Sequence, residues 1–147
     1  MYHWLNVDPC FCPVKQKRRG MAPEWQEPIR EEVRKLLRAR SIQEVQYPDW
    51  LVNLILVKNS NNKWRLCVDF IDLNKACPKD YYLLPRINLL VDATTGYSLI
   101  SFINAYAGYN HICMYPGDKE KTSFITDHGT YCYRVMPFGL KNAREIY

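Results

Sequence analysis

The sequence predicts an α+β domain, and three features of the chain lead to that class. One segment has the apolar spacing of an amphipathic helix, several short β-rich runs are separated by turn residues, and helices and strands do not alternate regularly. The length of 147 residues, with 48% hydrophobic and 24% charged side chains, is typical of one globular domain and argues against wholesale disorder.

The first predicted helix follows an N-terminal arm. Residues 1–23 contain three prolines, one glycine and no sustained periodicity, so we expect an extended arm there. In residues 24–40 the apolar side chains fall at helical spacing on one stripe, formed by Ile29, Val33, Leu36 and Leu37. Pro28 lacks an N–H group and clashes with a preceding helical turn, so we expect the ordered helix to begin close to Pro28.

A β-hairpin and a second helix are predicted next. Residues 51–58 and 63–70 are β-rich and flank Asn59-Ser60-Asn61-Asn62, which indicates a turn because Asn tolerates left-handed backbone. Residues 85–93 suggest a helix that Pro85 opens and that Gly96 follows as a stop signal.

The C-terminal third is predicted to be mostly strands. The β-rich runs are residues 99–104, 112–115, 121–126 and 130–136, and Asp127-His128-Gly129 favours a turn between the last two. Residues 139–147 look like the start of a further helix.

Basic side chains outnumber acidic ones, and they gather in the arm. The chain has 20 Lys and Arg against 15 Asp and Glu, and Lys15-Gln16-Lys17-Arg18-Arg19 places four cations in five residues. Such a cluster can contact phosphates, and a solvated surface run is the other interpretation.

Six cysteines raise the question of a metal site. Cys10 and Cys12 lie one residue apart, the other four are single, and no second ligand pair is present, so unpaired thiols are the favoured interpretation. No apolar run reaches the roughly 18–20 residues of a membrane span, and no secretory signal pattern opens the chain. We therefore expect an intracellular, reducing compartment and no membrane partner.

Three segments carry the chemistry. Residues 63–75 read KWRLCVDFIDLNK, residues 101–109 read SFINAYAGY, and residues 135–143 read VMPFGLKNA. In this order and spacing the chain resembles the reverse transcriptase of gypsy-class LTR retrotransposons, particularly the plant polyproteins, from about residue 5 to its end. The resemblance implies the fingers and a partial palm of a right-hand polymerase, incomplete because the chain stops before the active site closes.

The same resemblance implies a division of the chain. Residues 1–23 would be the extended basic arm, residues 24–95 a fingers-like region with a helix and a β-hairpin, and residues 96–147 a truncated palm and fingers portion. The reverse transcriptase-like domain would cover about residues 29–147.

In the first segment, the family uses an arginine of the fingers hairpin to grip the incoming nucleotide triphosphate. The resemblance assigns this role to Arg65, with Lys58 on the preceding strand as a weaker candidate. A planar guanidinium suits bidentate contact with phosphate oxygens. Without the motif, a surface cation on a strand would be the simpler interpretation of Arg65.

The second segment matches the strand that carries the family's first metal-binding aspartate. Polymerases of this class hold two Mg²⁺ ions with carboxylates. This chain has Asn104 at that position, and because an amide carries no negative charge we expect no intact metal site and no productive Mg²⁺ binding. Tyr109 matches the aromatic residue that selects deoxynucleotides by blocking a 2′-hydroxyl, and a packed core tyrosine is the alternative.

The third segment resembles the stretch beside the incoming base and the template. Phe138 would lie near the nucleotide, Gly139 would let the backbone approach closely, and Lys141 would reach a template phosphate unless it is only an exposed cation. The arm adds four further candidates for contact with template phosphates, namely Lys15, Lys17, Arg18 and Arg19.

The family completes its metal site with Tyr-x-Asp-Asp, and no Asp-Asp pair occurs in this chain. We therefore expect a fragment of an RNA-directed DNA polymerase that does not polymerise. Its partners by resemblance are an RNA or DNA template-primer, deoxynucleoside triphosphates, and a parent polyprotein with protease, RNase H and integrase. Two alternatives stay open: a non-catalytic nucleic-acid-binding remnant, and a relic without selected function.

Overall fold

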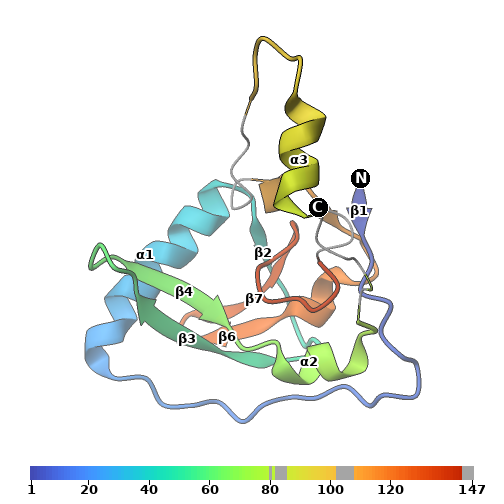
Figure 1. Cartoon of the computed structure of the whole chain (residues 1–147). Coiled ribbons are helices and arrows are strands. Elements are labelled where there is room, and N and C mark those ends of the chain that lie inside the picture. The colour runs from blue at the N-terminus through green and yellow to red at the C-terminus, as the bar shows by residue number, and fades with distance from the viewer. Residues whose placement is uncertain (80, 82–85, 102–107, 144–147) are drawn as a thin grey trace.

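A computed structural model describes residues 1–79, 81, 86–101 and 108–143. The described chain is a mixed α+β structure around a five-stranded sheet, which confirms the predicted fold class (Figure 1). In chain order its elements are β1 (Tyr2–His3), α1 (Pro23–Arg38), β2 (Ile42–Glu44), β3 (Val52–Lys58), β4 (Trp64–Val68), α2 (Ile71–Ala76), α3 (Ile87–Thr94), β5 (Cys113–Met114), the 3₁₀ helix η1 (Lys119–Thr122), β6 (Phe124–Thr126) and β7 (Gly129–Tyr133).

The five-stranded sheet has the order β2-β7-β6-β3-β4. Its strands are antiparallel except for β3 and β6, which run parallel with Val52 opposite Phe124. This parallel contact joins the β3–β4 hairpin to the β6–β7 hairpin in one sheet. Strands β1 and β5 form a separate two-stranded parallel pair.

The predicted hairpin of residues 51–70 is confirmed. Strands β3 and β4 pair antiparallel, with Leu54 opposite Val68. Between them the Asn62 N–H donates to the Asn59 carbonyl at 2.8 Å. Asn62 has a φ of +57°, the left-handed conformation for which Asn is suited.

Helix α1 begins at Pro23, so the prediction of a start near Pro28 is wrong. Pro23 takes the first helical position, where a missing N–H leaves no intrahelical bond unmade. Pro28 then lies in the second turn, where its missing N–H removes the bond to the carbonyl of Glu24. The predicted apolar stripe is confirmed, because Ile29 and Val33 are buried with 3% and 6% exposure.

The C-terminal strands are shorter than predicted. Strands β5, β6 and β7 lie within or overlap the predicted runs, and the Asp127-His128 turn joins β6 to β7. The prediction of a strand from residue 121 is wrong at its start, where η1 stands instead. Thr122 Oγ1 donates to the Lys119 carbonyl at 2.6 Å and Lys121 pairs with Asp118 at 2.6 Å, and both contacts favour a helical turn.

Two further predictions need correction. Leu99, Ile100 and Ser101 are irregular, and the remainder of the predicted strand 99–104 lies outside the described residues. Leu99 is 87% and Ile100 46% exposed, so neither of these two side chains has the burial that would favour a strand. Residues 139–143 form turns and irregular backbone instead of a helix, since Gly139 has a φ of +94°; residues 144–147 lie outside the described part.

Helix α3 confirms the helix predicted around residues 85–93, although Pro85 lies outside the described residues. None of its side chains is buried, and Figure 1 shows it projecting away from the sheet.

The N-terminal arm packs into the core. It runs in Figure 1 from β1 along the lower edge of the molecule to the start of α1. Leu5 is fully buried, its N–H donates to Asp118 Oδ2 at 2.9 Å, and its carbonyl accepts from Asn142 Nδ2 at 3.0 Å. Further along, the Gln16 N–H donates to the Leu51 carbonyl at 2.8 Å. Hydrogen bonds therefore hold the arm to the rest of the chain at Leu5 and at Gln16.

All six cysteines are free thiols. Among the described residues, no helix combines the length and the apolar character needed to cross a membrane.

Candidate nucleotide and nucleic-acid site

The structure brings Tyr109 and Phe138 together. Their rings meet edge to face, with centroids 4.5 Å apart and planes at 60°. Tyr109 is half-buried whereas Phe138 is 45% exposed, so the phenylalanine presents part of its ring to solvent beside the tyrosine. Edge-to-face aromatic pairs of this kind contribute about 0.5–1.5 kcal/mol beyond their buried area.

Asn74 of α2 fixes the turn that follows Phe138. Its Nδ2 donates to the Gly139 carbonyl at 2.7 Å, and its Oδ1 accepts from the Lys141 N–H at 2.8 Å. A Cβ atom on Gly139 would meet only the Phe70 ring, at an ordinary 3.7 Å, so it is the positive φ that requires glycine here. Lys141 is exposed at the end of this turn. We define Tyr109, Phe138, Gly139 and Lys141 as the aromatic cluster.

The two cations predicted as nucleotide contacts, Arg65 and Lys58, lie on opposite faces of the β3–β4 hairpin. Arg65 stands opposite Val57 and Lys58 stands opposite Trp64, so the two pairs are adjacent rungs of one ladder. Side chains on adjacent rungs alternate between the faces of a sheet. Lys58 Nζ lies 4.8 Å from the Trp64 ring centroid, a cation–π contact on its own face. Arg65 and Lys58 therefore cannot grip one phosphate together in this conformation.

The basic segment of the arm, residues 15–19, is fixed by Asn53 of β3. Asn53 is only 2% exposed, donates from Nδ2 to the Lys17 carbonyl at 3.0 Å, and accepts the Arg19 N–H on Oδ1 at 3.1 Å. Gln16 completes the contact, since its Oε1 accepts from both Asn53 N at 3.0 Å and Asn53 Nδ2 at 3.2 Å. The cations thus extend from an ordered backbone.

A groove of about 500 Å³ lies beside this segment. Its lining carries both signs of charge, from Lys17, Arg18, Arg19, Asp69 and Asp72. Hydrogen bonds from Lys75 and then Gln16 lower the pKa of Asp72, which keeps this carboxylate charged. The groove is therefore mixed in charge.

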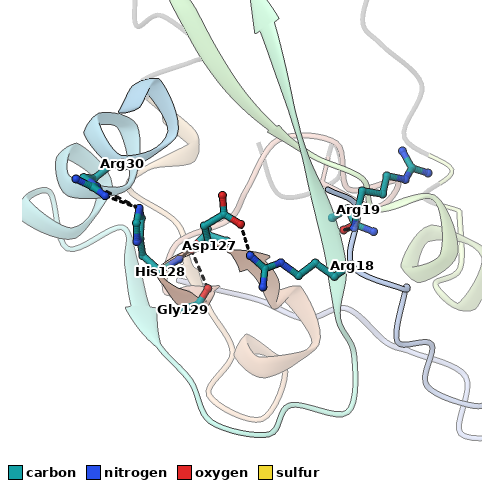
Figure 2. Close-up of polar contacts among 8 residues, drawn as sticks. Arg18, Arg19, Arg30, Asp127, His128 and Gly129 are labelled. Atoms are coloured by element: carbon teal, nitrogen blue, oxygen red, sulfur yellow. Dashed lines mark hydrogen bonds and ion pairs between the residues drawn. The ribbon is translucent and has the colours of Figure 1, made fainter. Parts of the chain in front are cut away.

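Arg18, which also lines this groove, forms an ion pair with Asp127 in the β6–β7 turn, as Figure 2 shows. On the other side of the same turn, Arg30 of α1 donates from Nε to His128 Nε2 at 3.1 Å. Neither Arg30 nor His128 was predicted as a site residue. The turn between them is fixed by Thr126, whose Oγ1 donates to the Gly129 carbonyl at 2.9 Å and accepts the His128 N–H at 3.1 Å.

Asn104, the predicted metal position, lies outside the described residues. Within the described ranges, no group of three or more His, Cys, Asp or Glu side chains is placed to hold a metal ion.

The comparisons with known proteins agree on one family. Residues 56–147 match the family model described as reverse transcriptase (RNA-dependent DNA polymerase). The chain is 32% identical over 136 residues to the retrovirus-related Pol polyprotein from transposon 412 of Drosophila melanogaster, covering 89% of this chain and 11% of that protein. It is 35% identical over 79 residues to an RNA-directed DNA polymerase homolog of Oenothera berteroana, covering 54% of this chain and 56% of the homolog.

A solved structure supports the fold. A foamy viral protease-reverse transcriptase in complex with double-stranded DNA superposes with a TM-score of 0.73 and 14% sequence identity, covering 99% of this chain and 25% of that one. At this identity the likeness shows the fold alone. The chain spans about a tenth of the transposon 412 polyprotein and a quarter of the foamy viral chain.

Proposed function

Because the chain belongs to the reverse transcriptase (RNA-dependent DNA polymerase) family, we propose that it is a nucleotide- and template-binding portion of a retrotransposon polymerase and that it does not itself polymerise. The observation that carries the binding half of this proposal is the aromatic cluster. An exposed Phe138 ring beside half-buried Tyr109 offers an apolar surface to a sugar or base, and Lys141 adds a cation for a phosphate.

The proposed inactivity rests on the sequence. Mg²⁺ in this reaction class orients the attacking hydroxyl and neutralises charge on the phosphates, and it requires hard anionic ligands. Asn104 offers a neutral carbonyl oxygen at the position that the family fills with aspartate, and the 147 residues contain no Asp-Asp pair. The donor set in this chain does not fit a two-ion site, so no catalytic step is assigned to it.

Primer extension tests the inactivity. The chain is incubated with a primer-template duplex, deoxynucleoside triphosphates and Mg²⁺, beside an active reverse transcriptase as the positive control. We expect no incorporation above background. Extension of the primer by the purified chain would refute the proposal, provided that a mock purification from the same cells is inactive.

A nucleotide-binding assay tests the proposal that the chain binds a deoxynucleoside triphosphate. We expect a fluorescent deoxynucleoside triphosphate to bind the chain in the absence of extension, and Phe138→Ala to weaken that binding because it removes the exposed half of the aromatic pair. Tyr109→Ala should narrow the difference in affinity between deoxyribo- and ribonucleotides. Tyr81→Ala is the matched control, since Tyr81 is 92% exposed and lies outside the aromatic cluster. Equal deoxynucleotide affinity of Phe138→Ala and Tyr81→Ala, or an unchanged preference for deoxyribonucleotides in Tyr109→Ala, would contradict the assigned roles.

The non-catalytic nucleic-acid-binding remnant stays the second candidate function, favoured by the fixed basic segment of the arm. In either case the parent protein is proposed to be a polyprotein with protease, RNase H and integrase, since the relatives named above include a Pol polyprotein.

A further inference from the structure

A second basic surface lies between α1 and the β6–β7 turn, apart from the segments that the sequence motifs single out. Arg30 and Arg34 are four residues apart, so they lie on the same side of α1. They line a groove of about 240 Å³ together with His128 of the turn, and the floor is apolar, formed by Val33, Leu37 and buried Tyr131.

The charge of this groove suits an anion. No Asp or Glu is among the residues that line it, in contrast to the groove beside the arm, which Asp69 and Asp72 line together with the cations. Among the described residues, the side chains of Arg34 and Arg19 form no ion pair, so their charges are not neutralised by a carboxylate contact. Arg30 forms an ion pair with Glu27, with a long distance of 3.4 Å between Nη1 and Oε2.

The β6–β7 turn joins this groove to the arm. Figure 2 shows Arg30 and His128 on one side of the turn, and Asp127 with Arg18 and Arg19 on the other. His128 Nε2 lies within hydrogen-bond distance of both Nε and Nη2 of Arg30, at 3.1 and 3.0 Å, and these contacts fix the guanidinium beside the turn. We call the four arginines on the two sides of this turn the basic band: Arg18 and Arg19 of the arm, and Arg30 and Arg34 of α1.

We propose that the basic band binds the sugar–phosphate backbone of a single nucleic-acid strand, with its principal contacts at Arg30 and Arg34. This inference rests on the proposed function, because it names a surface that the bound template would use. The groove is smaller than the about 300–1,000 Å³ of pockets that enclose small ligands, which favours a strand passing over it. Guanidinium groups pair well with phosphate oxygens, and each phosphate neutralised releases counterions.

The test is the salt dependence of binding. A fluorescein-labelled single-stranded RNA is titrated with the intact chain by anisotropy, at salt concentrations from about 50 to 200 mM. In Arg30→Ala/Arg34→Ala we expect the slope of log K against log salt to become shallower by about 1.4, which corresponds to an affinity loss of about 25-fold at 0.1 M salt. The matched control Lys35→Ala/Arg86→Ala removes two exposed cations outside the band and should change the slope by less than half as much.

Two more variants separate binding from folding. Arg30 also holds the β6–β7 turn, so Arg34→Glu is measured alone, because Arg34 makes no such contact in the described structure. Arg34→Lys keeps the charge and should keep the salt slope. We expect Arg34→Glu to weaken binding more than tenfold with an unchanged circular dichroism spectrum.

The outcomes distinguish the two proposals. If the unaltered chain binds no RNA, the proposed function fails and the basic band fails with it. If the chain binds RNA but the Arg30→Ala/Arg34→Ala slope equals that of the control pair, only the basic band is overturned. Inorganic phosphate at matched ionic strength should not displace the RNA; displacement would mean a site for free phosphate and would also overturn the inference.

Discussion

Gln16 and Asn53 are 37 residues apart, yet the Gln16 Oε1 accepts hydrogen bonds from both the backbone N–H and the Nδ2 of Asn53, at 3.0 and 3.2 Å. The same Asn53 side chain accepts from Arg19 and donates to the Lys17 carbonyl, all at a site only 2% exposed. A single buried amide therefore docks the basic segment of the arm against β3.

Asn53→Ala should lower the free energy of unfolding by about 1–3 kcal/mol, because buried partners that lose a hydrogen bond pay their full desolvation cost. Urea unfolding followed by tryptophan fluorescence measures this change. Asn61→Ala, in the exposed hairpin turn, is the control and should stay within about 0.5 kcal/mol of the unaltered chain. The docking argument is wrong if the two variants are equally stable.

The turn after Phe138 depends on a glycine. Gly139 has a φ of +94°, and Gly139→Ala should cost about 1–2 kcal/mol because an L-residue with a Cβ is strained there. Gly20→Ala is the control, since nothing lies within 4 Å of the added Cβ and its backbone is not left-handed. In thermal melts Gly139→Ala should lower the melting temperature, whereas Gly20→Ala should leave it unchanged or raise it slightly. Equal losses of stability in the two variants would contradict this account.

Five of the six thiols should fall into two classes of reactivity, with half-buried Cys67 between them. Burial raises the pKa of both Cys77 and Cys132 to about 11, against an ordinary 9.0, which lowers their thiolate fraction about 100-fold. Cys10, Cys12 and Cys113 are exposed. Alkylation followed by mass spectrometry at about pH 8 should modify the exposed thiols first and the two buried ones only after urea is added. Early modification of Cys132 in the folded chain would show that β7 is more open than described.

Local signals account for the parts of the fold that the sequence predicts well. The apolar stripe of α1 and the Asn-rich turn of the β3–β4 hairpin depend on residues that are close in sequence, and both predictions are confirmed. The start of α1 was missed because Pro23, the favourable first helical residue, was assigned to the arm. Strand β2 and helix α2 were not predicted, since each is too short to show a period and is stabilised by distant partners.

In the candidate site, too, contacts between distant residues are the part that the sequence does not predict. The family resemblance implies that Tyr109 and Phe138 both lie near a nucleotide, but their ring contact is not predicted, because nothing in the spacing of two residues in different segments indicates it. Asn74 was missed although it bonds Gly139 and Lys141, since an amide in a six-residue helix carries no local sign of its partners. The opposite orientation of Arg65 and Lys58 could have been found from the period-two alternation of paired strands.

Stability should fall as the pH drops through the range where His3 titrates. His3 is fully buried in β1, and within the described structure neither ring nitrogen has a hydrogen-bond partner. Burial lowers its pKa below the ordinary 6.5, and the Asn142 amide and the Asp118 carboxylate offset only part of that effect. Below pH 6.5 the unfolded chain therefore binds a proton that the folded chain excludes, so the free energy of unfolding decreases until the folded-state pKa is reached.

Urea midpoints measured between about pH 8 and pH 5 should show this loss of stability, and His3→Phe should remove most of it. His111→Gln, at an exposed position, is the matched histidine control. A His3→Phe profile that still parallels that of the unaltered chain would assign the effect to other groups.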